Sequence, residues 1–154
     1  MRYRGSAGPD RRPGSSAGKG MISSGVYQLL VWLTRGRKLR VGSLGHRMFN
    51  KGWYIYTGSA QKNFFHRLLR HHHKDKKYHW HIDYLLGIGE IVAYDYLPYR
   101  DGLECDTHQH TLAEFSGGIE VTGFGCSDCR CSSHLIYISM SINDNITSGY
   151  NKLT

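Results

Sequence analysis

The sequence predicts an α+β fold in which a small central, mainly antiparallel sheet is flanked by helices. Runs of aromatic and β-branched residues alternate with helical stretches, so the order along the chain reads β, β, α, β, α, β. There is no internal repeat. A chain of 154 residues supports one domain with a hydrophobic core and seldom two. We therefore expect a single folded unit.

Four segments have the composition of strands: Gly25–Leu33, Trp53–Thr57, residues 90–98 and Ser133–Ser139. The first is an almost continuous apolar run, which is typical of a central strand covered on both faces. In the second, alternation places Tyr54 and Tyr56 on the same side of the sheet. The third stops at Pro98. Turn glycines around Lys38–Val41 indicate a hairpin between the first two strands.

Two further segments have the pattern of helices. From about Ser59 to His72, apolar and basic residues occupy opposite faces at helical spacing. We expect Gly58 and Ser59 to turn the chain out of the preceding strand and to start this helix. Glu104–Phe115 has no interior glycine or proline and forms the second helix. Trp80–Leu86 fits a helical turn or a strand, and the sequence leaves both open.

The two ends of the chain are polar. Residues 1–20 are rich in Gly, Ser, Pro and Arg and are expected to be a disordered basic arm; residues 141–154 are expected to be a polar C-terminal tail. The formal net charge is +8, of which the arm carries half, so both arm and domain favour anionic partners. No apolar run approaches the roughly 20 residues of a membrane span, so we expect a cytoplasmic protein with no membrane partner.

Short motifs then follow one another in a specific order. They are Gly25-Val26-Tyr27, Tyr56-Thr57-Gly58, Arg67-x3-His71, "WHIDYLL" from Trp80, the pair Glu104-Cys105, and "GFGCSDCRCSSHLIYI" from Gly123. Together they resemble the GIY-YIG nuclease superfamily, and most closely its Uri-type branch, over about Ser23–Ile138. The resemblance implies a nuclease domain in residues 21–140 and a metal-dependent endonuclease that hydrolyses phosphodiester bonds in DNA, with RNA not excluded.

The resemblance also implies a role for each matching residue. Tyr27 would activate or orient the attacking water, with Tyr56 beside it on the neighbouring strand. Arg67 and His71 lie four residues apart on one helix face and would hold the scissile phosphate together. Glu104 matches the single metal-binding carboxylate of the family and would hold Mg²⁺ or Mn²⁺.

Several alternatives stay open. A tyrosine with a pKa of about 10 is a weak base at neutral pH, so either a cation such as Arg67 lowers the pKa of Tyr27 or the metal delivers the water. Glu114 is a second candidate carboxylate on the same helix as Glu104. Asp83 could orient a histidine, join the site or make a buried structural hydrogen bond. The domain could also be a catalytically inactive nucleic-acid-binding module with the same fold, and its oligomeric state stays open.

A basic stretch and a cysteine block are the remaining candidate sites. Four residues of the basic stretch are expected to face nucleic acid: Arg70, Lys74, Lys76 and Lys77. The histidines at positions 71–73 point around a helix, so they cannot all bind one ion. The cysteine block supplies four soft ligands for a possible structural zinc ion: Cys126, Cys129, Cys131 and His134. Usual zinc sites draw on two separated ligand pairs, so we expect packed thiols in a glycine turn rather than zinc.

Overall fold

The centre of the protein is a six-stranded sheet with the strand order β6-β7-β4-β1-β5-β8. The computed structural model describes residues 22–139 and 151–152, so the arm and most of the tail expected from the sequence lie outside it. All paired neighbours run antiparallel, and the strands are β1 (Gly25–Leu33), β4 (Gly52–Ala60), β5 (Glu90–Pro98), β6 (Ile119–Glu120), β7 (Leu135–Ile138) and β8 (Asn151–Lys152). The predicted α+β fold with a mainly antiparallel sheet is confirmed.

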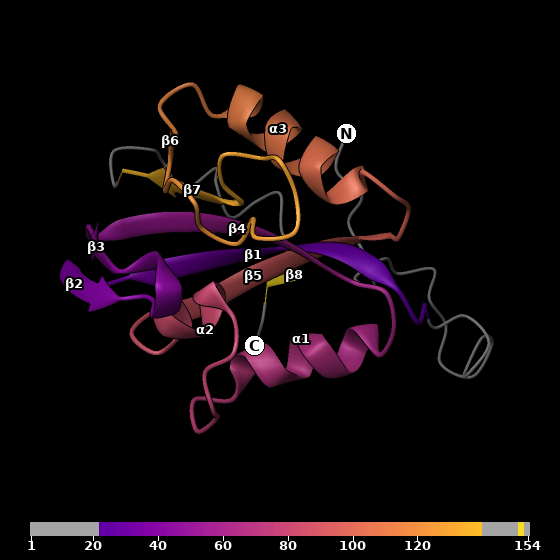
Figure 1. The fold of residues 1–154 in the computed structure, drawn as a ribbon, viewed down its shortest axis with the longest axis horizontal. Helices are drawn as coiled ribbons and strands as arrows, with labels where there is room; N and C mark the ends of the chain where they lie inside the picture. The colour runs from indigo at the N-terminus through magenta and orange to yellow at the C-terminus, as the bar shows by residue number, and fades with distance from the viewer. Residues whose placement is uncertain (1–21, 140–150, 153–154) are drawn as a thin grey trace.

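A separate two-stranded hairpin occupies the segment between β1 and β4, as the sequence predicts. Its strands are β2 (Arg37–Arg40) and β3 (His46–Phe49), joined through a short 3-10 helix, Gly42–Leu44. Figure 1 shows the hairpin projecting at one end of the sheet. The buried Phe49 side chain belongs to the same apolar cluster as the sheet residues, so the hairpin is anchored to the main core.

Helices cover both faces of the sheet (Figure 1). They are α1 (Phe64–His72), α2 (His81–Leu86) and α3 (Leu103–Glu114), with α1 and α2 on one side and α3 on the other. Residues 81–86 of the ambiguous segment are therefore helical, and Trp80 directly precedes the helix. Among the described residues, no helix is long and apolar enough to cross a bilayer.

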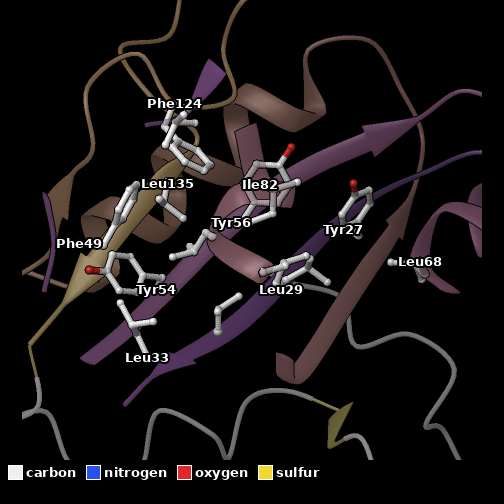
Figure 2. Packing of buried hydrophobic residues seen from close by; sticks show 14 of the residues in the cluster. Tyr27, Leu29, Leu33, Phe49, Tyr54, Tyr56, Leu68, Ile82, Phe124 and Leu135 are labelled. Carbon is white, nitrogen blue, oxygen red and sulfur yellow. The ribbon is translucent and has the colours of Figure 1, made fainter. Parts of the chain in front are cut away.

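The larger apolar cluster lies between the sheet and the pair α1–α2. Tyr54 and Tyr56 of β4 point into it together with Leu29 and Ile82, as Figure 2 shows, so the predicted alternation of β4 is confirmed. A smaller cluster on the opposite face contains Ile55 and packs against α3. The sheet thus separates two cores, and the larger one adjoins the candidate site.

A polar contact fixes α3 on its face of the sheet. The buried Gln28 side chain of β1 donates hydrogen bonds to Thr57 Oγ1 of β4 at 3.0 Å and to Thr111 Oγ1 of α3 at 2.8 Å. The two N–H groups of this buried amide are each paired with a specific hydroxyl, which favours one seating of the helix. This seating determines where the first turn of α3 reaches the other elements of the site.

The predicted turn at Gly58 and Ser59 is wrong. Strand β4 continues to Ala60, because Gly58 pairs with Tyr27 of β1 and Ser59 with the residue before it. The chain leaves the sheet after Ala60 and turns into the helix at Asn63, which adopts a left-handed backbone with φ of 54° and directly precedes α1. Asparagine tolerates this conformation better than most residues. The helix consequently begins at Phe64 rather than at Ser59.

Candidate functional site

A cleft of about 150 Å³ brings together residues from four separate elements and from the loop after β6. Its lining residues are Tyr56, Ser59, Arg67, His79, Trp80, His81, Glu104, Gly125, Ser127 and Asp128. Three of them have a catalytic or metal-binding role predicted from the motifs: Tyr56 from β4, Arg67 from α1 and Glu104 from α3. These three share one solvent-accessible space although the elements that carry them are far apart in the sequence.

Glu104 lies in the first turn of α3, with its carboxylate between the cleft and the loop before β7. Ser59 Oγ donates a hydrogen bond of 2.6 Å to Oε2, and Nδ1 of His134 lies 3.0 Å from Oε1. A carboxylate has about four lone-pair positions, so these contacts leave room for a cation that enters from the cleft. Glu114, the alternative carboxylate, lies 3.2 Å from His110 at the end of α3 and does not line the cleft.

Two contacts hold Arg67 at the cleft. Its guanidinium donates a hydrogen bond to the backbone oxygen of Ser59 and lies over the indole ring of Trp80, 4.4 Å from the ring centroid. A guanidinium has five N–H donors in a planar fork, so the contact with Ser59 leaves donors for an anion in the cleft. Arg67 is thus a preorganised cation next to the carboxylate of Glu104.

Tyr27 and His71 form a buried pair beneath the cleft. The hydroxyl of Tyr27 lies 2.7 Å from Nε2 of His71, and each residue is 2% exposed. The ring of Tyr27 lies 6.3 Å from that of Tyr56. Because His71 contacts Tyr27 and does not line the cleft, the expectation that it grips the phosphate together with Arg67 is wrong. Burial lowers the pKa of His71 to about 3, so its imidazole is neutral.

The two tyrosines are also neutral. Burial raises the pKa of Tyr27 well above its ordinary value, and the neighbouring Arg67 offsets this only in part. Burial likewise raises the pKa of Tyr56, with Tyr27 and Glu104 adding to the effect. Of the two routes left open by the sequence, a cation that brings the pKa of Tyr27 into the neutral range is therefore wrong for this structure.

Two glycines of the motifs make room for aromatic rings. A Cβ atom on Gly58 would lie 2.7 Å from the ring of Tyr27, and one on Gly25 would lie 2.6 Å from the ring of Phe64. Contacts this short are not tolerated in a packed interior. The glycines are thus required by packing: Gly58 leaves space for the ring of Tyr27, and Gly25 leaves space for Phe64 at the start of α1.

The motif at Trp80 supplies two residues to the cleft, Trp80 and His81, and one to the scaffold, Asp83. Nδ1 of His81 accepts a 2.9 Å hydrogen bond from the N–H of Gly125, so Nε2 carries the hydrogen and can donate into the cleft. Asp83 is fully buried and accepts hydrogen bonds from the backbone N–H groups of His79 and Trp80 at the start of α2. Of the readings left open for Asp83, the buried structural hydrogen bond is the one observed.

The basic stretch is mostly engaged within the protein. Arg70 forms a two-pronged ion pair with Asp83 at 3.0 and 3.1 Å, and Lys76, 8% exposed, donates to two backbone oxygens of α1. Both residues are therefore paired with the buried Asp83, and 26% of the Arg70 side chain is exposed; their contact with nucleic acid stays a prediction. Lys74 is half-exposed and donates to backbone oxygens at the end of α2. Lys77 is exposed, and its contact with nucleic acid stays a prediction.

Four soft donor groups converge beside Glu104, and they differ from the predicted set by one residue. The ligand atoms of Cys105, Cys129, Cys131 and His134 all lie within 4.8 Å of one another. Cys105 of α3 replaces Cys126. The group could hold a metal ion, and thiolates favour zinc over magnesium. Zinc sites usually combine ligands from two separated segments. Cys105 is the cysteine that lies outside the cysteine block, and this separation is the sequence signal that could have identified it as a ligand.

Comparisons with known proteins identify one family. A family model described as "Domain of unknown function DUF123" matches residues 26–154. No curated protein and no solved structure matches the chain. The matched range includes every lining residue of the cleft and all four soft donors.

Proposed function

The chain belongs to the DUF123 family, a domain of unknown function, and we propose that it is a small metal-dependent endonuclease acting on DNA. The observation that carries the proposal is the shared cleft of Tyr56, Arg67 and Glu104. Each of the three belongs to a motif that resembles those of Uri-type GIY-YIG nucleases. An arginine, a carboxylate and hydroxyl donors around one opening suit a phosphodiester.

Two cleft residues bind the phosphate in this proposal. Arg67 presents free N–H donors of its fork to the non-bridging oxygens and offsets the negative charge that grows as the new P–O bond forms. The Nε2–H of His81 donates a further hydrogen bond from another part of the cleft wall. Both donors are fixed before substrate enters, by Ser59 and by Gly125, so little reorganisation is needed.

Glu104 is the residue that would hold Mg²⁺ or Mn²⁺. Its oxygens are hard donors, and 28% of its side chain is exposed at the cleft, which fits a cation that keeps several waters and binds phosphate oxygens. When bound, such an ion supplies charge neutralisation at the phosphate and makes a neighbouring water more acidic. The soft donors around Cys105 do not suit this ion.

The tyrosines act as neutral hydrogen-bonding groups. Because burial raises the pKa of both hydroxyls, neither is a ready anionic base at neutral pH. Tyr56, at the cleft wall, orients the attacking water or the phosphate through its hydroxyl. Tyr27 packs against the ring of Tyr56, and His71 holds the hydroxyl of Tyr27. Tyr27 and His71 together therefore fix the position of Tyr56. Tyr27 and His71 are thus positioning residues in this proposal.

Cleavage assays with a matched pair of carboxylate variants test the proposal. Purified protein is incubated with supercoiled plasmid and with duplex, branched and single-stranded DNA and RNA, in Mg²⁺, Mn²⁺ or EDTA. We expect metal-dependent nicking of DNA that Glu104→Gln reduces by at least about 100-fold, because a catalytic metal is worth several kcal/mol. Glu114→Gln, on the same helix but away from the cleft, should cleave normally.

Two results would contradict the proposal. Full activity of Glu104→Gln would remove the carboxylate from the mechanism. Binding of DNA without cleavage in any metal would favour the inactive nucleic-acid-binding module instead.

Two further predictions from the sequence stay predictions: a cytoplasmic location, and a contribution of residues 1–20 to binding of the DNA backbone.

A further inference from the structure

The soft donors beside the cleft form a second, independent site. We propose that this protein binds one structural zinc ion through the side chains of Cys105, Cys129, Cys131 and His134, and that the ion fixes the position of Glu104 through His134. The first half of the proposal concerns metal binding alone. The second half rests on the proposed function, in which Glu104 is the catalytic carboxylate.

Two separations between donor atoms match those expected around a tetrahedral zinc ion. With Zn–S of about 2.3 Å and Zn–N of about 2.0–2.1 Å, a tetrahedral angle places sulfur and nitrogen about 3.6 Å apart. The observed distances from His134 Nε2 are 3.6 Å to the sulfur of Cys105 and 3.5 Å to that of Cys129. Three thiols and one imidazole are a ligand set used by structural zinc sites.

The ligands come from two separate segments. Cys105 lies in the first turn of α3, whereas the other three donors lie in the connection between β6 and β7. Residues 121–134 of this connection contain neither helix nor strand. A metal ion that joins them to α3 would supply the cross-link that regular structure does not.

Burial also favours a bound ion over loosely packed thiols. His134 is 1% exposed and turns its Nε2 toward the sulfurs, while the three cysteines are half-buried and free of disulfides. Three thiols cannot all pair as disulfides with one another. Cys126, which lies in the same connection as Cys129 and Cys131, stays outside the group, so the convergence selects particular cysteines rather than the whole block.

The same histidine connects the zinc site to the cleft. If Nε2 of His134 binds zinc, the ring hydrogen is on Nδ1, and Nδ1 lies 3.0 Å from Oε1 of Glu104. An imidazole that is held by a metal and lies this close to a carboxylate restrains where the carboxylate can lie. Glu104 and Cys105 are also neighbours in the chain, so binding of Cys105 restrains the backbone of Glu104. His134 is therefore a positioning residue for the carboxylate.

Metal analysis of the full chain tests the first half. We expect one zinc per chain in protein purified without chelator, and a Co²⁺-substituted form with sulfur-to-cobalt charge-transfer absorption and the intense visible bands of tetrahedral cobalt. Cys105→Ser should reduce the bound metal to well below one equivalent, whereas Cys126→Ser, the matched control from the cysteine block, should retain it. Sub-stoichiometric zinc in the wild-type chain, with no uptake of Zn²⁺ or Co²⁺ by chelated protein, would overturn the site. Loss of metal from Cys126→Ser but not from Cys105→Ser would overturn the ligand assignment.

A single substitution separates zinc binding from positioning. His134→Cys keeps four soft donors, so it should still bind one zinc and give a cobalt spectrum typical of four thiolate ligands, but it has no N–H to offer Glu104. We expect the Mg²⁺ concentration for half-maximal DNA cleavage to rise about 10-fold or more in this variant. An unchanged Mg²⁺ requirement with zinc bound would overturn the positioning role. A wild-type chain that cleaves nothing would overturn the proposed function and the positioning step with it, while the zinc site would still be judged by its stoichiometry.

Discussion

The buried pair of His71 and Tyr27 makes the stability of the protein depend on pH. Burial, with a contribution from the charge of Lys76, lowers the pKa of His71 to about 3, against an ordinary value of 6.5. Between these two values, the unfolded chain binds a proton at this residue and the folded chain does not. Acid therefore favours unfolding: the contribution of His71 is constant above about pH 7 and is lost progressively as the pH falls from 6.5 toward 3.

The magnitude follows from the two pKa values. Each pH unit in this window costs about 1.4 kcal/mol for one group, so lowering the pH from about 7.5 to about 5 should cost about 2 kcal/mol through His71 alone. Urea unfolding followed by tryptophan fluorescence at the two pH values measures the loss. We compare the wild type with His71→Gln, which cannot titrate, and with His66→Gln, which removes an exposed histidine of the same helix.

The comparison isolates His71 because other titrating groups contribute to all three proteins alike. Wild type and His66→Gln should lose about 2 kcal/mol more than His71→Gln when the pH is lowered. An equal loss in all three proteins would refute the reasoning. It would mean that His71 takes up a proton in the folded state as readily as in the unfolded chain.

Three further predictions concern packing, charge and phosphate binding. Gly58→Ala places a Cβ atom 2.7 Å from the ring of Tyr27 and should lower the free energy of unfolding by about 1–3 kcal/mol in urea; unchanged stability would contradict the packing role of this glycine. Asp83→Asn removes the buried charge that pairs with Arg70 and should cost about 3 kcal/mol, measured by thermal unfolding; a loss below ~1 kcal/mol would show that the pair is dispensable. Arg67→Lys keeps the charge but loses the planar fork, so it should slow DNA cleavage about 10-fold or more with little change in Tm, and normal cleavage would exclude Arg67 from phosphate binding.

Local sequence patterns predict a helix or strand well where the residues of the segment itself determine its secondary structure. The strands Gly25–Leu33 and residues 90–98 occur with the predicted bounds. The first is an almost continuous apolar run, which suits a strand covered on both faces, and the second ends at Pro98, which interrupts a strand. The start of α1 was misplaced because Gly58 was interpreted through its turn propensity. Its actual function, to leave space for the ring of Tyr27, depends on a residue in another strand. The two-residue strands β6 and β8 were missed, since such short segments have no detectable periodicity.

The candidate site was predictable in its residue types but not in their contacts. Glu104 and Arg67 were placed by motif order, and both line the cleft. Sequence patterns treat a run of lysines and arginines as a solvated face, yet the buried carboxylate of Asp83 forms ion pairs with Arg70 and Lys76. No local rule indicates that a residue 13 positions away will be the partner. Cys105 was overlooked for the same reason, because its neighbours in space come from a distant loop.

The close packing of the Tyr27 ring against Gly58 has a consequence for how relatives of this protein are classified. A glycine under an aromatic ring is demanded by the shape of the interior, so it would persist in a chain that had lost all hydrolytic capacity. The glycines of the two motifs therefore indicate that a relative has the same fold, and they do not indicate whether it is catalytically active. Under the proposed function, the positions of Glu104 and Arg67, whose side chains line the open cleft, are the ones that should distinguish an active relative from an inactive one.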